Sequence, residues 1–243
     1  MTFAEFDAKA ALNAYLAHPL ARIHQLAPRR ALDAQQLLRR LVSDLAPASY
    51  LAAYMIATAS WETGLTFRPE TERGSDQYLV DRYWGNPRIR RELWVASPDE
   101  AIRYRGRGYV QTSLPRNYLR EMAEANGVVW HEDRGVMMRR LGLEPTAYAA
   151  DPNGVAPPAP DLDFWRSPDL LLVQDNAYRA LVRGMMSGRI TGVSLGRYLN
   201  ETKRNWIDAR RVVNGVDHAV EIAHDAEAWF VAIESATKKG VEA

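Results

Sequence analysis

The amino-acid sequence predicts a mainly α-helical protein with one small β element. Apolar residues recur at helical spacing through most of the chain, and prolines and glycines stand at the ends of these periodic segments. The 243 residues show no internal repeat and have an ordinary globular composition, with 47% hydrophobic and 25% charged residues. We therefore expect a single domain over residues 1–243, with residues 1–30 as a candidate N-terminal helical extension.

The first half of the chain contains three predicted helices. Asp33 is expected to cap a helix over residues 34–45, which carries a stripe of leucines. Pro47 opens a second, largely apolar helix, which Gly64 is suited to end. A third helix is predicted over residues 76–84.

Residues 103–113 have a different composition, because two glycines stand among β-branched and aromatic residues. Such a cluster predicts a bend or a short hairpin. Pro115 then restarts a helix, which Gly127 closes. A last amphipathic helix is predicted over residues 218–236.

The one linker-like stretch covers residues 151–168 and contains five prolines. It is either a domain boundary or an ordered surface loop. Leu162, Phe164 and Trp165 favour the ordered loop, because such apolar side chains are unusual in a free linker.

Composition excludes several classes of function. The chain has no cysteine, so disulfides and thiol catalysis are excluded, and its five histidines lack the paired spacing of a metal site. Thirty-one basic and thirty acidic residues give a net charge of +1, which argues against nucleic acid as a partner. We expect no cofactor, no metal, no membrane insertion and no signal peptide, since no apolar run reaches about 18 residues and no basic leader precedes one.

Glu62 is the first candidate for chemistry. Leu51, Met55, Ala59 and Glu62 share one face of the second predicted helix, and that face is otherwise apolar. Partial burial and the negative end of the helix dipole both favour a protonated carboxyl, the form that a general acid needs. The alternative is that Glu62 turns into solvent at the helix end.

Glu70 and Glu72 follow in a short loop beyond Pro69. Exposed loop carboxylates are usually just solvated. Two carboxyl groups in different environments are nevertheless what glycoside hydrolysis requires, one to protonate the leaving oxygen and one to activate water. Ten residues of chain can span up to about 33 Å, so the sequence leaves the separation of the two groups open.

The segment from Tyr104 to Tyr118, YRGRGYVQTSLPRNY, resembles the signature of glycoside hydrolase family 19, the chitinase-like lysozyme group that includes many bacteriophage endolysins. Three further blocks resemble the family in the same order: ATASWET followed by PETE, then RGMMSGRITGVSLGRYLN, then ARRVVNGVDHAVEIA. Departures are Trp61 in place of the usual His, the Leu-Pro-Arg that precedes Asn117, and residues 73–102, which match no pattern of the family.

The resemblance implies a lysozyme-like α+β domain, a helical bundle with a small β-hairpin beside the active-site cleft. It implies that Glu62 is the general acid and Glu72 the general base of an inverting reaction, with Glu70 a bystander. Ser113 is then expected to help hold the attacking water. The substrate-binding residues that it implies are Tyr104, Gln111, Asn117 and, near the acid, Asn214. For Gln111 and Asn117 the alternative is that their amides only satisfy loop and helix-end polar groups.

The resemblance also implies a function. We expect a monomeric endolysin that cleaves β-1,4 bonds between the amino sugars of bacterial peptidoglycan, kept in the host cytoplasm until a holin-type pore releases it to the wall. The alternatives are a chitinase on the same fold, acting on a chitin-like oligosaccharide, and a non-catalytic glycan-binding relative. A nucleic-acid binder that uses RYRGRGY as a basic, aromatic strip is the remaining alternative.

Overall fold

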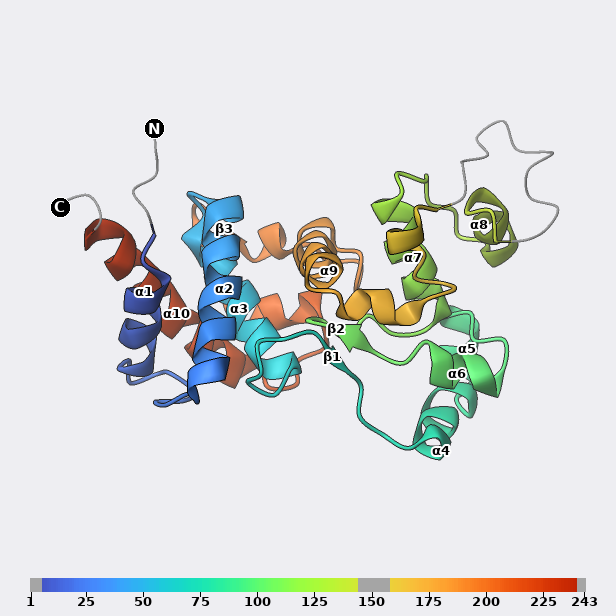
Figure 1. Ribbon diagram of the computed structural model, residues 1–243, viewed down its shortest axis with the longest axis horizontal. Helices are drawn as coiled ribbons and strands as arrows, with labels where there is room; N and C mark the ends of the chain where they lie inside the picture. Colours follow the sequence, from blue (N-terminus) through green and yellow to red (C-terminus); the bar gives the residue numbers. More distant parts are fainter. Residues whose placement is uncertain (1–5, 144–157, 240–243) are drawn as a thin grey trace. The chain divides into compact units, whose positions relative to one another are not determined.

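The computed structural model describes residues 6–143 and 158–239, and it confirms the prediction of a mainly α fold (Figure 1). The chain divides into two compact units rather than one. Unit 1 contains the chain up to Arg68 and from Leu181 onward, and unit 2 is the insertion Pro69–Ala180. Sequence periodicity could not reveal this division, because unit 1 is closed by contacts between the two ends of the chain.

Unit 1 is built on α3 (Ser49–Glu62). The helix α10 (Ala219–Lys239) packs along α3, α2 (Pro28–Leu45) packs on α3 as well, and α1 (Ala8–Leu16) packs on α10 (Figure 1). Every residue of α3 from Leu51 to Ser60 is buried, so the helix is covered on all sides and not on the single face that the sequence predicted. This continuous burial explains its nearly uninterrupted run of small and apolar residues.

The two ends of α3 follow the sequence signals. The helix ends at Glu62, Thr63 is the C-cap, and Gly64 has a φ of +59°, the left-handed conformation that glycine adopts without steric cost. The predicted helix end at Glu62 is therefore confirmed. Its position places the carboxyl group at the rim of the core of unit 1.

Two predictions for the N-terminal region were wrong. Helix α1 is part of the core and not an extension, because Tyr15 stacks on Trp229 of α10 with ring centroids 3.7 Å apart. Helix α2 begins at Pro28, so Asp33 lies inside it and caps nothing. The Asp33 carboxylate instead pairs with Arg68, whose Nε donates at 2.6 Å.

The remainder of unit 1 follows unit 2 in the sequence. The chain re-enters unit 1 within α9 (Gln174–Ser187). It continues through the 3-10 turns η5 (Leu195–Arg197) and η6 (Asp208–Val212) and the antiparallel pair β3 (Leu199–Asn200) and β4 (Lys203–Arg204). Leu199 pairs with Arg204 and Asn200 with Lys203.

Unit 2 consists of short helices around two apolar clusters. Helix α7 (Pro115–Ala125) lies in the larger cluster, with Tyr104, Phe164 and Leu171. The smaller cluster contains Leu79, Tyr83, Val95, Ala101 and Leu114. Outside the undescribed residues 144–157, the unit also contains the start of α9 and these helical segments: α4 (Asp76–Leu79), the π-helix η1 (Val80–Trp84), α5 (Pro87–Glu92), α6 (Pro98–Arg103), α8 (Arg134–Arg140), η3 (Pro160–Leu162) and η4 (Pro168–Leu172).

The predicted bend at residues 103–113 is present, but its main strand partner is distant in sequence. Strand β2 (Arg107–Gly108) pairs antiparallel with β1 (Glu70–Thr71), in the register Glu70 to Gly108 and Thr71 to Arg107. A local bridge between Arg107 and Thr112 closes the bend itself. The pairing with β1 places the end of the Glu70–Glu72 loop beside the motif.

The proline-rich stretch is not the boundary between the units. Its described part begins at Pro158, and residues 151–157 lie outside the described residues. Phe164 is buried in the larger cluster of unit 2, and Leu162 and Trp165 pack against that cluster. The expectation of an ordered segment is confirmed for residues 158–168. Within the described ranges, each helix is either too short or too polar to span a bilayer.

Candidate functional site

Glu62 is held by a buried arginine of unit 1. Arg210, on η6, donates from Nη1 to Glu62 Oε1 at 2.6 Å, and its Nε donates to the carbonyl of Asp217 at 3.0 Å. Arg210 is 2% exposed and the Glu62 side chain 17% exposed. The carboxyl group therefore does not turn into solvent. Arg210 is part of a sequence motif, but only the structure shows that it pairs with Glu62.

This ion pair places a guanidinium in direct contact with Glu62 at the end of α3. Arg210 bonds Oε1 of the carboxyl group, so Oε2 is the oxygen that this contact leaves available.

Two other predicted features lie near the end of α3. Trp61 is fixed between Arg22, whose Cζ lies 3.9 Å from the ring centroid, and His218, whose ring centroid is 4.5 Å away. Asn214 is exposed, and its N–H donates to the carbonyl of Arg210 at 3.0 Å, while its Oδ1 accepts from the N–H of Gly215 at 2.9 Å. The chain thus places Asn214 in the turn that follows Arg210.

Both carboxylate oxygens of Glu72, in unit 2, accept a hydrogen bond. The N–H of Gly106 donates to Oε2 at 2.9 Å, and the hydroxyl of Tyr83 donates to Oε1 at 2.5 Å. The Glu72 N–H donates in turn to the carbonyl of Gly106 at 2.7 Å, so hydrogen bonds join the loop and the motif in both directions. Tyr83 lies in the segment that matched no family pattern, and sequence reasoning missed it.

Gln111 and Ser113 lie directly over Gly106. A Cβ atom added to Gly106 would stand 2.7 Å from Gln111 Oε1 and 2.9 Å from Ser113 Oγ. The structure therefore gathers three motif residues around the backbone group that binds Glu72. The segment is also strained, because Gln111 has a φ of +51° and Leu114 a φ of +71°.

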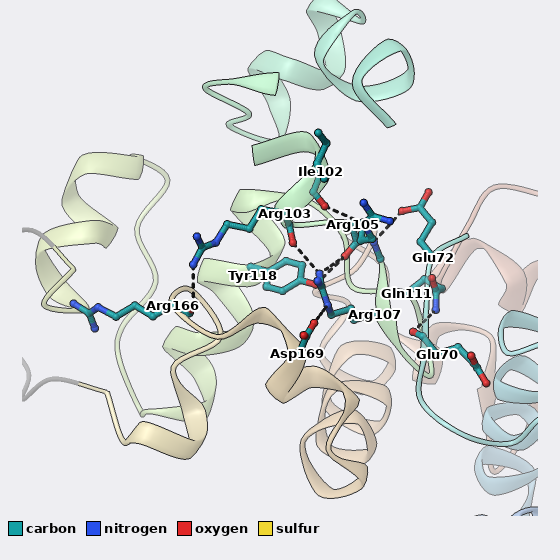
Figure 2. A network of polar contacts seen from close by, with 11 residues as sticks. Glu70, Glu72, Ile102, Arg103, Arg105, Arg107, Gln111, Tyr118, Arg166 and Asp169 are labelled. Carbon is teal, nitrogen blue, oxygen red and sulfur yellow. Dashed lines mark hydrogen bonds and ion pairs between the residues drawn. The ribbon is translucent and has the colours of Figure 1, made fainter. Parts of the chain in front are cut away.

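The amide nitrogens of this loop are used inside the protein. Gln111 Nε2 donates to the carbonyls of Glu70 and Gly108 at 3.1 and 3.2 Å (Figure 2). Asn117 Nδ2 donates to the carbonyl of Ser113 at 2.9 Å. Ser113 Oγ donates to the carbonyl of Gln111 at 2.7 Å. Both N–H donors of the Gln111 amide are therefore used inside the loop, whereas the Asn117 amide uses one of its two.

Tyr104 requires a correction. It is 2% exposed, its ring lies 4.4 Å from that of Trp165 and 5.1 Å from that of Tyr118, and its hydroxyl donates to the carbonyl of Trp165 at 3.2 Å. A ring so enclosed supports the motif from the core and does not contact a substrate. Tyr104 lies only two positions before Gly106 in the motif. Sequence spacing alone therefore did not reveal that its side chain points into the core.

Arg107 stabilises the turn in front of Gly106. Its Nη1 donates to the carbonyls of Arg103 and Arg105 at 2.9 and 3.1 Å, and its Nε pairs with Asp169 at 2.8 Å (Figure 2). The Tyr118 hydroxyl accepts from the same Nη1 at 2.8 Å. Arg107 thus orients backbone and binds Asp169, and neither candidate carboxylate.

The basic strip of the motif is largely compensated. Arg105 pairs with Asp76 at 2.5 Å and Arg107 with Asp169, so two of its three arginines have carboxylate partners. A nucleic-acid backbone would have to displace these carboxylates, which weighs against that alternative. Among the residues that the structure describes, no group of three or more His, Asp or Glu side chains is arranged to hold a metal ion.

Comparison of the chain with protein-family models, with curated proteins and with solved structures found no match. The case for a function therefore depends on the residues of this chain and on their geometry.

Proposed function

We propose that this protein is a glycoside hydrolase that cleaves β-1,4 bonds between the amino sugars of bacterial peptidoglycan. The observation that carries the proposal is the environment of Glu72. Each oxygen of its carboxylate accepts a hydrogen bond, and one of the donors is Gly106, at the start of the strained loop that contains Gln111 and Leu114. The order of the sequence motifs supports the same function.

In the proposed reaction, Glu62 gives its proton to the glycosidic oxygen as the bond to the anomeric carbon breaks. Glu72 takes a proton from a water molecule, and that water attacks the anomeric carbon from the opposite face, with inversion. Inverting enzymes need about 6.5–9.5 Å between the two carboxyl groups to leave room for the water. Arg210 holds Oε1 of Glu62, so the proton is assigned to Oε2.

The test uses the full chain, purified sacculi and chitin oligomers. Glu62→Gln and Glu72→Gln are each expected to lower product release by about 10²-fold or more, since each removes a proton-transfer group. Glu70→Gln is the matched control from the same loop and should retain activity. Mass analysis identifies the bond cut, and NMR of the first-formed anomer identifies inversion.

Three outcomes would contradict the proposal. They are the absence of product from sacculi with the wild-type chain, full activity in Glu62→Gln, and an anhydro product, which indicates a lyase. Faster release from chitin oligomers than from sacculi would assign the same chemistry to a chitinase.

A further inference from the structure

We propose that Tyr83 is a positioning residue for Glu72, and that its hydroxyl fixes the base in the orientation that water activation requires. This inference rests on the proposed function and adds a residue that the motif does not contain. Three features of the described structure carry it: the contact itself, the packing that fixes the phenol, and the unusual helix turn that presents it.

The hydrogen bond from Tyr83 to Glu72 is short, and a second hydrogen bond holds the other carboxylate oxygen. Tyr83 donates to Oε1 of Glu72 at 2.5 Å, and the Gly106 N–H donates to Oε2 at 2.9 Å. Two donors on two different oxygens define the plane of the carboxylate, whereas one donor would leave it free to rotate. Each carboxylate oxygen has a second lone pair, so the group can still accept a proton from water.

The phenol itself has little freedom. Tyr83 is 8% exposed, and its ring lies in the smaller apolar cluster of unit 2 with Leu79, Val95 and Leu114. On the same helical segment, Arg82 places its Cζ 5.5 Å from the Tyr83 ring centroid. The hydroxyl is therefore held at one place beside Glu72 and loses little entropy in making the bond.

A π-helical turn brings Tyr83 to this position. The N–H of Gly85 donates to the carbonyl of Val80 at 2.9 Å, an i to i−5 bond, and the turn spans Val80–Trp84. A Cβ at Gly85 would stand 2.5 Å from the carbonyl oxygen of Asp81, so glycine is required for the turn to close. Single π turns are uncommon and often occur at functional sites.

The phenol remains a donor across the physiological range. Burial first, and then the hydrogen bond and charge of Glu72, raise the pKa of Tyr83 far above that of a free tyrosine. The other ionisable groups that act on this pair are Arg82 and Tyr78 on the same segment and Tyr118 of α7, which also senses the charge of Glu72. The neutral hydroxyl therefore keeps the proton that it donates to Oε1 of Glu72.

The test compares Tyr83→Phe with Tyr198→Phe in the full chain. Tyr83→Phe keeps the ring and removes the donor to Glu72. Tyr198 is buried to a similar extent in unit 1, with its ring beside Lys203, so Tyr198→Phe is the matched control. We expect Tyr83→Phe to lower kcat about tenfold on sacculi, with a smaller change in KM. Tyr198→Phe should leave both constants at their wild-type values.

A second readout does not depend on activity. In protein labelled with ¹³C at glutamate carboxyls, the Glu72 signal is assigned by its loss in Glu72→Gln, and its chemical shift should move in Tyr83→Phe and not in Tyr198→Phe. An unmoved signal together with an unchanged kcat overturns the role of Tyr83. If the signal moves but the wild-type chain releases no product, the hydrolase proposal and the catalytic role of Tyr83 both fail, and only the contact is supported.

Discussion

At the scale of single residues, Gly106 determines how the candidate site is arranged. Its N–H and carbonyl both bond Glu72, and its missing side chain leaves room for Gln111 and Ser113. The glycine is therefore required by the close approach of these side chains, and its φ lies outside the left-handed region.

Gly106→Ala should lower activity on sacculi by about tenfold or more while costing only about 1 kcal/mol of stability. The new Cβ would stand 2.7 Å from Gln111 Oε1 and 2.9 Å from Ser113 Oγ, so both side chains must shift from the positions they hold around the Gly106 backbone. Gly196→Ala is the control, because a Cβ there meets no atom within 4 Å. Rates and urea unfolding curves of both variants check this, and equal rates would refute it.

At the scale of elements, a buried carboxylate ties three segments of unit 1 together. Asp225 of α10 accepts from the hydroxyl of Tyr15 on α1, from the N–H of Arg22 at 3.1 Å and from Ser60 Oγ of α3 at 3.2 Å. Burial is the largest cause that raises the pKa of Asp225, and it exceeds the lowering effect of these donors.

The sign of the resulting pH dependence follows from linkage. A carboxyl whose pKa is raised by folding binds its proton more tightly in the folded state, so its contribution to stability is complete below about pH 4 and is lost as the pH rises. Asp225→Asn should flatten the unfolding free energy between about pH 4 and pH 7. Denaturation series at several pH values measure this, and a variant as pH-dependent as wild type would contradict it.

At the scale of the whole molecule, the two units have separate cores. Met55 of α3 is fully buried in unit 1, and Met122 of α7 is fully buried in unit 2. Truncating a buried methionine to alanine typically costs about 2–5 kcal/mol.

If the cores are energetically separate, each truncation should loosen its own unit. We expect Met122→Ala to speed amide hydrogen exchange in α7 while leaving α3 and α10 protected, and Met55→Ala to do the reverse. Peptide-level exchange followed by mass spectrometry checks both variants. Equal loss of protection in both units after either substitution would mean that the chain unfolds as one cooperative body.

The sequence by itself determined what is local. Pro115 and Gly127 delimit α7, and Gly64 ends α3. The position of Glu62 at the end of α3 follows from the helical spacing of the apolar residues in the preceding three turns. Helix starts and stops depend on neighbouring backbone groups, so residue types at short spacing are enough to predict them. The start of α2 was misplaced because Pro28 offers an earlier first turn than Asp33.

Only the tertiary structure decided which residues meet. Arg210 bonds Glu62, Tyr83 bonds Glu72, and strand β1 pairs with β2, although the two partners of each pair are separated in sequence. It also placed Tyr104 in a core rather than at a surface. Such contacts depend on how apolar surfaces of distant segments pack together, and the spacing of residues along one chain contains no direct measure of that packing.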